Sequence, residues 1–162
     1  MGWDIRAIML QTDLVEDEDY KLLPKEYEEA GSPTELVNKI YNVSDVYLTT
    51  TLGEGWGLGF SEAAACKLPV IAPYTTSYME MSGYGKNAYM LETIYPYVHT
   101  NDNVVREQTD IMEVGETILQ VAKDKYSNAL DQKIKIEQNY KWAQKLDWKE
   151  VCKSWIEYFK IY

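Results

Sequence analysis

Positions 53 to 72 of the chain have the sequence GEGWGLGFSEAAACKLPVIA. Three glycines alternate with larger residues between two carboxylates: Glu54, Gly55, Gly57, Gly59 and Glu62. The small residues after the second carboxylate are typical of a helix, and the apolar run at 69–72 indicates a buried strand. A loop this rich in glycine lets its backbone approach a ligand closely. The stretch therefore predicts a ligand-binding loop followed by a helix and a strand.

The residues before this loop complete a strand–helix–strand unit. Positions 46–51 are apolar and β-branched, which is typical of a strand. The loop (52–60) and a helix over 60–67 then lead to the strand at 69–72. Such a unit joins parallel strands, so we predict an α/β fold, a Rossmann-like parallel sheet flanked by helices. The loop should lie at the carboxyl edge of that sheet, where folds of this class bind ligands.

The remaining sequence adds further helices and less regular segments. Ser32 and Glu35 form a capping-box pattern around Pro33, which predicts a helix start. Amphipathic spacing predicts helices from 111 to about 136, over 127–141 and over 147–159. We also expect a short buried strand at 5–10, a turn-rich segment at 73–88, a short strand and loop at 89–99 and an exposed polar loop at 100–110.

The length of the chain favours a single domain. Its 162 residues show no internal repeat and nothing that marks a second domain. We therefore predict one Rossmann-like domain over 1–162, with an irregular acidic N-terminal part at 1–31 and a C-terminal helix at 142–162.

Composition argues against several classes of function. Sixteen Lys and Arg against 26 Asp and Glu give a net charge of −10, which disfavours nucleic acid and anionic membranes as partners. Cys66 and Cys152 lie far apart without a metal-ligand pattern, so we expect no disulfide framework and no metal site. Two unpaired thiols suit a reducing, cytoplasmic location. We expect no transmembrane segment, because no apolar run approaches the roughly 20 residues that a membrane-spanning helix needs.

The loop carries groups suited to an anionic, hydroxyl-rich ligand. A helix start presents unpaired N–H groups and a partial positive charge, so anions bind there. The carboxylates of Glu54 and Glu62 can accept paired hydrogen bonds from vicinal hydroxyls of a sugar. An acid near a helix start also has a plain structural role as a partner of the helix dipole. Thr75 follows the strand at 69–72 and is placed to line the same cleft.

The stretch from Glu54 to Ala72 resembles the signature of retaining glycosyltransferases of the GT-B fold, in particular the "group 1" family, glycosyltransferase family 4. Members carry two glutamates separated by seven residues, then a small-residue helix and a "PVI" strand. Positions 36–48 look like the family's helix-then-strand lead-in, and 85–88 is similar to its Gly-x-Asn-Gly turn, with Ala88 in the last place. The resemblance covers roughly residues 36–162.

The resemblance implies the C-terminal, donor-binding half of a GT-B enzyme of hexosyltransferase type. Such a half transfers a sugar from a nucleotide-diphospho-sugar to an acceptor hydroxyl with retention, without a metal or other cofactor. Glu54 would be the catalytic residue and would bind donor-sugar hydroxyls near the reacting carbon, while Glu62 would bind the ribose. The donor-binding set implied in this way is Gly55, Trp56, Gly57, Leu58, Gly59, Glu62 and Thr75.

The chain also departs from the family pattern. The family carries an Arg and a Lys after the first strand of this half, and no stretch before residue 36 matches that motif; Arg6 lies in a predicted strand and Lys21 and Lys25 in the acidic segment. We therefore expect most of a donor-binding half that begins after its first strand and needs an N-terminal domain or a partner chain. The alternative is a non-catalytic interaction module that keeps the glycosyltransferase fold. A third possibility is another sugar-phosphate enzyme, such as an epimerase or a phosphorylase.

Overall fold

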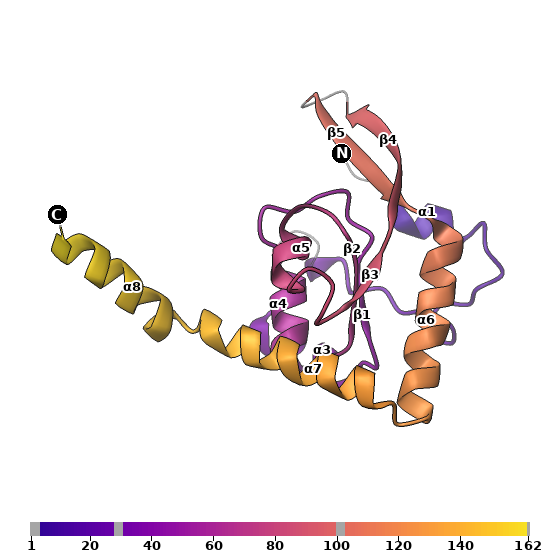
Figure 1. Cartoon of the computed structure of the whole chain (residues 1–162). Coiled ribbons are helices and arrows are strands. Elements are labelled where there is room, and N and C mark those ends of the chain that lie inside the picture. Colours follow the sequence, from indigo (N-terminus) through magenta and orange to yellow (C-terminus); the bar gives the residue numbers. More distant parts are fainter. Residues whose placement is uncertain (1–3, 28–30, 100–102, 162) are drawn as a thin grey trace. The chain divides into compact units, whose positions relative to one another are not determined.

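The computed structural model describes residues 4–27, 31–99 and 103–161, without the side chains of His99 and Ile161. The chain divides into two compact units, Met1–Val37 and Asn38–Tyr162. Figure 1 shows the elements along the chain, coloured from the N-terminus to the C-terminus. The carboxylates, the glycine loop and every predicted site residue belong to the second unit.

The first unit begins with a short helix, α1 (Ile5–Met9), where the sequence predicts a strand at 5–10. That prediction is wrong. The Asp4 carboxylate accepts a hydrogen bond from the Ala7 N–H at 3.1 Å, and the Ile8 N–H donates to the Asp4 carbonyl at 3.1 Å. Because these bonds are local, the segment satisfies its backbone without a neighbouring strand. Ile5 and Ile8 remain 56% and 44% exposed, so they are not the core residues that a buried strand would supply.

Three parallel strands form the sheet of the second unit, in the order β1 (Tyr47–Leu48), β2 (Val70–Pro73) and β3 (Tyr89–Leu91). Tyr47 pairs with Val70, and Ile71 pairs with Tyr89. The central strand β2 is buried at all four positions, as expected for a parallel strand covered on both faces. The predicted strand–helix–strand unit is therefore present, although β1 is shorter than the run at 46–51.

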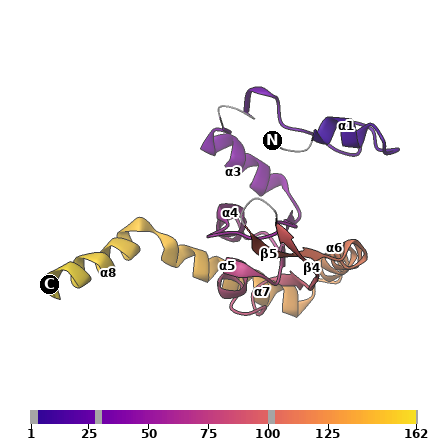
Figure 2. The same ribbon diagram turned by 90° about the horizontal axis from the view of Figure 1, so that it is seen from above.

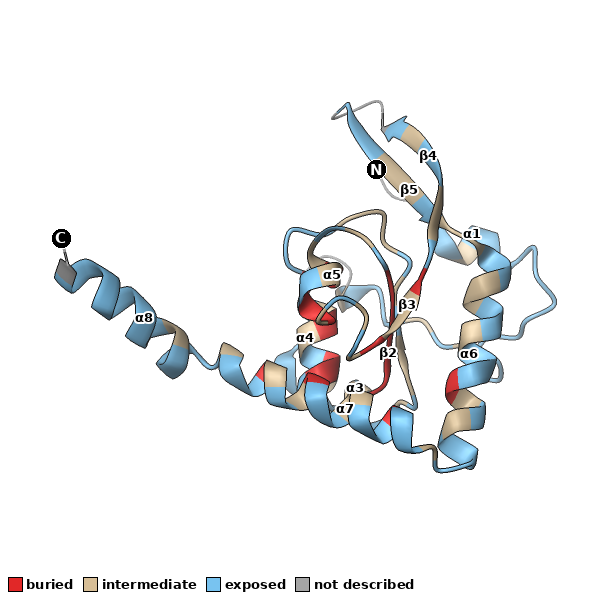
Figure 3. Cartoon of the chain, viewed as in Figure 1, coloured by how far each residue is buried: buried red, intermediate tan, exposed pale blue. Residues whose placement is uncertain are grey.

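Helices cover both faces of this sheet. The side chains of β2 alternate: Val70 and Ala72 pack with Phe60 of α4 (Leu58–Ala65) and Tyr78 of α5 (Thr76–Met81), while Ile71 packs with Val121 of α6 (Ile111–Tyr126). Figure 3 shows the buried residues concentrated along β2 and on α4 and α5. The alternation follows from the two-residue period of a strand.

The remaining helices lie before β1 and at the end of the chain. Helix α3 (Thr34–Val43) begins two residues after Ser32, in agreement with the predicted helix start. The predicted helix from 111 is interrupted at Ser127–Ala129, where Asn128 has a φ of 58°, so α6 ends and α7 (Leu130–Ala143) follows. A short 3-10 helix, η1 (Gln144–Leu146), leads to α8 (Trp148–Ile161), drawn in yellow in Figure 2.

A hairpin interrupts the α/β order after β3. Strands β4 (Thr93–His99) and β5 (Val104–Thr109) pair antiparallel, with a register shift between Ile94 and Tyr97. The prediction of an exposed loop at 100–110 is therefore wrong from position 104 onward, because Val104 and Val105 begin a strand that the polar residues after them continue. The turn-rich segment at 73–88 likewise contains a helix, α5.

Candidate functional site

The glycine loop follows β1, at the carboxyl end of the parallel sheet, and leads directly into α4. Gly57 is the residue before the helix and has a φ of 93°, in the left-handed region that favours glycine. A Cβ atom at this position would lie 3.0 Å from Cζ of Tyr78 and 3.1 Å from its hydroxyl oxygen. The loop therefore lies directly against the Tyr78 ring, which is 1% exposed.

A second tyrosine supports the next glycine. A Cβ atom at Gly59 would come within 3.0 Å of the Tyr47 ring and hydroxyl, so a larger residue has no room there. Burial raises the pKa of Tyr47, and it raises the pKa of Tyr78 to about 12, so both rings are neutral at pH 7. Two of the three alternating glycines are thus required by contacts within the protein. At Gly55 a Cβ atom would meet nothing within 4 Å, so that position faces open space.

Hydrogen bonds to α5 hold the loop from the other side. The Glu54 N–H donates to Oγ1 of Thr76 at 3.1 Å, and the Ser77 hydroxyl donates to the Trp56 carbonyl at 2.8 Å. The Trp56 ring stacks on Trp142 of α7, with ring centroids 6.2 Å apart and an interplanar angle of 23°. The loop is therefore connected to two helices as well as to the two tyrosines.

Glu54 presents its carboxylate at the surface. The side chain is exposed, and Oε1 accepts a hydrogen bond from the Thr51 hydroxyl at 3.3 Å. An exposed carboxylate in a loop whose backbone is fixed can accept hydrogen bonds from hydroxyl groups of a ligand without a large ordering cost. This geometry suits the sugar-binding role that the resemblance implies for Glu54.

Glu62 lies past the first turn of α4, where the helix dipole has little effect, so the structural role of a dipole partner does not explain it. The side chain is exposed, and Oε2 accepts a hydrogen bond from the Tyr41 hydroxyl of α3 at 3.1 Å. Burial, together with the hydrogen bond to Glu62, raises the pKa of Tyr41, so this hydroxyl remains a donor at neutral pH. Tyr41 therefore fixes the orientation of the Glu62 carboxylate.

Thr75 stands immediately after β2, as the half-buried, extended residue before α5. Its neighbour Thr76 makes the bond to Glu54, so the start of α5 and the glycine loop lie side by side. The structure therefore brings together the predicted residues from Glu54 to Gly59 with Thr75. Glu62 lies farther along α4, beside Tyr41.

Sequence reasoning missed several side chains that shape this site. The three tyrosines around the loop make their contacts across 12 to 21 positions, so no local pattern points to them. Arg106 is a further case: its guanidinium lies beside Gly53, where a Cβ atom would be 3.7 Å from Cζ of the arginine. It was missed because its segment was predicted to be a polar loop; the one available signal was the pair of valines before it. The residues that the sequence did not assign to the site are Tyr41, Tyr47, Tyr78 and Arg106.

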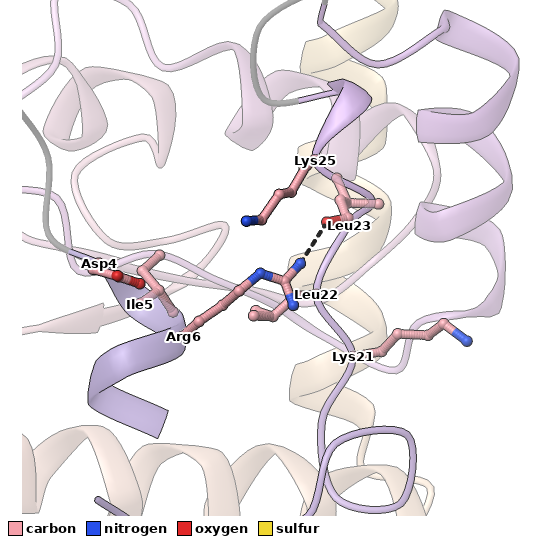
Figure 4. A pocket seen from close by; sticks show the side chains of 7 residues that line it. All are labelled: Asp4, Ile5, Arg6, Lys21, Leu22, Leu23 and Lys25. Carbon is pink, nitrogen blue, oxygen red and sulfur yellow. Dashed lines mark hydrogen bonds between the residues drawn. The ribbon is translucent and has the colours of Figure 1, made fainter. Parts of the chain in front are cut away.

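The cations before residue 36 line a separate pocket within the first unit, with a volume of about 570 Å³. Figure 4 shows Lys25 extending above the Arg6 guanidinium, while Lys21 points away from it. Acidic residues offset these charges: Arg6 pairs with Glu16 at 3.1 Å, and Lys21 pairs with Asp17 at 3.0 Å. Carboxylates therefore offset two of the three positive charges of this pocket.

Within 4–27, 31–99 and 103–161, no three His, Cys, Asp or Glu side chains are grouped so that they could bind a metal ion. None of the helices in these ranges combines the length and the apolar character needed to cross a bilayer. Both cysteines are free; burial raises the pKa of Cys66, so its thiol is less reactive than usual.

The chain is similar in sequence to one known protein and in structure to another. No protein-family model matches the chain. The mannosylglucosylglycerate synthase of Thermotoga maritima is 30% identical over 137 residues, which cover 76% of this chain and 30% of that protein. The crystal structure of the GtfA/B complex contains a chain that matches 76% of this one with a TM-score of 0.55 and 25% identity, over 22% of its own length.

These similarities support conclusions about the fold and about the broad class of protein. They confirm the predicted α/β fold, a parallel sheet flanked by helices that is structurally similar to the glycosyltransferase GT-B fold. The chain is similar to a glycosyltransferase in sequence and in structure. It spans less than a third of the length of either protein.

Proposed function

We propose that this chain is the donor-binding part of a retaining, group 1 (family 4) glycosyltransferase of hexosyltransferase type. It would bind a nucleotide-diphospho-sugar, and the assembled enzyme would transfer the sugar to an acceptor hydroxyl. One observation carries the proposal: the loop from Gly53 to Glu62 is fixed on two tyrosines at the carboxyl edge of a parallel sheet, with an exposed carboxylate near each end. The likeness to a mannosylglucosylglycerate synthase supports it.

The proposed roles follow the geometry of the loop. Glu54 accepts hydrogen bonds from hydroxyls of the donor sugar, and Glu62, oriented by Tyr41, accepts them from the ribose. The backbone from Gly55 to Gly59 faces the sugar and the diphosphate. The first amides of α4 offset negative charge that grows on the departing diphosphate. In this proposal Thr75 lines the donor cleft, no metal or other cofactor takes part, and the protein works in the cytoplasm.

The other half of the active site would come from an N-terminal domain or a partner chain, which also binds the acceptor. The chain corresponds to 30% of the Thermotoga maritima protein, and the structural neighbour was crystallised as a complex. Helix α8 exposes large apolar side chains, including Trp148 (77%), Trp155 (57%) and Phe159 (68%). Exposed apolar surface of this kind is typical of a contact with another protein surface.

Ligand-induced stabilisation tests the donor site directly. We expect at least one of the common nucleotide-diphospho-sugars to raise the melting temperature of the chain, because a ligand that binds only the folded state stabilises it. Replacing Glu62 with alanine removes a charged acceptor, and each hydrogen bond to a charged group contributes about 1.5–3 kcal/mol, so the affinity should fall roughly 10- to 100-fold. Isothermal titration calorimetry measures this loss.

A matched variant separates the site from general effects of charge. Glu116→Ala removes an exposed carboxylate from the middle of α6, and it should leave the affinity for the donor unchanged. If no nucleotide sugar shifts the melting temperature of the wild-type chain, the donor-binding proposal is wrong.

The exposed apolar face of α8 favours a second candidate, a non-catalytic interaction module that keeps the glycosyltransferase fold. This candidate predicts that a partner chain binds through Trp155 and Phe159 while nucleotide sugars do not bind. A nucleotide-dependent rise in melting temperature would contradict it.

A further inference from the structure

The hairpin β4–β5 brings a cation to the glycine loop. Each of the three parallel strands leads, at its carboxyl end, to one part of the site: β1 to the glycine loop, β2 to the start of α5, and β3 to the hairpin. Parallel strands end at the same edge of their sheet, so the three segments meet there. Arg106 of β5 lies opposite Tyr97 of β4 in this hairpin.

The contact between Arg106 and the loop is close. A Cβ atom at Gly53 would lie 3.7 Å from Cζ of Arg106, within 3.0 Å of its Nη1, and 3.4 Å from the Thr76 methyl group. Thr76 is the residue whose hydroxyl oxygen accepts the Glu54 N–H. The guanidinium, Gly53 and Thr76 therefore meet at one point, one residue before Glu54.

We propose that Arg106 is a phosphate-binding residue, whose guanidinium donates to the diphosphate oxygens of the donor nucleotide. The inference rests on the proposed function, because it assigns the cation of the same site. A planar guanidinium with paired N–H groups matches phosphate oxygens better than a lysine does.

The electrostatics of the site favour a cation close to the diphosphate. The chain has a net charge of −10, and two carboxylates are exposed at the site, Glu54 in the loop and Glu62 in α4, so a diphosphate is repelled unless a cation lies close to it. Arg106 is half-buried against the loop, where its charge is screened less than that of an exposed side chain.

The residue after Arg106 in β5, Glu107, lies on the other face of the hairpin. Successive residues of a strand point to opposite faces, so Glu107 and Arg106 face opposite ways. Glu107 is occupied on its own face, where Oε2 accepts a hydrogen bond from the Thr93 hydroxyl. Glu107 is therefore engaged with β4 on its own face of the hairpin.

Binding of a nucleoside diphosphate, compared with the nucleoside that lacks the phosphates, tests the assignment. The probes are UDP, GDP, ADP and dTDP with uridine, guanosine, adenosine and thymidine, titrated calorimetrically into the full 162-residue chain. For the diphosphate that binds the wild type, Arg106→Gln should weaken binding by roughly tenfold or more, the range for hydrogen bonds to a charged group. The affinity for the matching nucleoside should stay the same.

Two further variants test the same contact, and a third serves as a control for net charge. Arg106→Lys keeps the charge but loses the planar fork, so its affinity should lie between those of the wild type and Arg106→Gln. Gly53→Ala should also weaken diphosphate binding, because its methyl group displaces the mobile end of the arginine. Lys133→Gln on α7 changes the net charge by the same amount at an exposed position, and it should bind like the wild type.

The outcomes separate the two proposals. If the wild type binds a nucleoside diphosphate and Arg106→Gln binds it equally well, the assignment of Arg106 is wrong while the proposed function stands. An equal loss of diphosphate and nucleoside affinity would also overturn it, since that indicates a structural role. If the wild type binds none of the four diphosphates, the proposed function fails, and this inference fails with it.

Discussion

Replacing Gly57 with alanine should destabilise the protein through two separate effects. The residue has a φ of 93°, and a left-handed conformation costs a non-glycine residue about 1–2 kcal/mol. The added Cβ atom would also overlap the buried ring of Tyr78, with Cε1 nearer than Cζ, and overpacking of this kind costs about 1–3 kcal/mol. The expected loss in the free energy of unfolding is therefore about 2–5 kcal/mol.

Urea unfolding followed by tryptophan fluorescence measures this loss, and calorimetry gives the change in melting temperature. At roughly 2–4 °C per kcal/mol for a chain of this size, the melting temperature should fall by about 4–20 °C. Gly55→Ala is the matched control, because a Cβ atom there meets nothing within 4 Å. Its free energy of unfolding should change by less than about 1 kcal/mol.

A double mutant separates strain from steric overlap. In a Tyr78→Leu background the ring is absent, so Gly57→Ala should cost about 1–2 kcal/mol, the conformational part alone. If Gly57→Ala and Gly55→Ala destabilise the protein equally, or if the cost at Gly57 is independent of Tyr78, then the ring contact does not explain this glycine.

Two other predictions concern the tyrosines around the loop. Tyr41→Phe removes the hydroxyl that donates to Glu62. A hydrogen bond contributes about 0.5–1.5 kcal/mol, so the affinity for the donor nucleotide, measured by calorimetry, should fall about 2- to 10-fold. An unchanged affinity would show that Tyr41 does not position Glu62. Burial raises the pKa of Tyr78 to about 12 from an ordinary value of 10.0, so above pH 10 the unfolded chain releases a proton that the folded chain keeps. Stability should therefore be independent of this group below pH 10 and fall between pH 10 and about 12 in urea unfolding, and Tyr78→Phe should reduce the slope; an equal slope in the variant would refute the assignment.

The central part of the fold could be predicted from the sequence because its signals are local. The alternation of glycines, the small-residue run and the apolar strand at 69–72 lie within 20 positions, and the structure contains the loop, α4 and β2 in that order. Glu54 and Glu62 could be selected as candidates for the same reason, since their spacing around the helix start is visible in the sequence alone.

The wrong predictions share a physical cause. The composition of a segment does not reveal whether its backbone bonds within itself or pairs with another segment. The run at 5–10 has the composition of a strand, yet its backbone closes a helix with Asp4 as the cap. The segment at 104–109 looks polar, yet it pairs with β4 on both sides of a register shift. Arg106 could not be placed at the site from the sequence, since its contact with Gly53 spans 53 positions and depends on that pairing.

The structure also changes the explanation for the glycines of the loop. Gly57 and Gly59 are explained by the rings of Tyr78 and Tyr47, so they are not by themselves evidence of a ligand. Their effect on binding is indirect: a loop fixed on the buried ring of Tyr78 and the half-buried ring of Tyr47 orients its amides before a ligand arrives, which lowers the ordering cost of binding. Gly55 differs, because open space surrounds it. A side chain there should leave stability intact and obstruct a ligand, whereas one at Gly57 should reduce stability first.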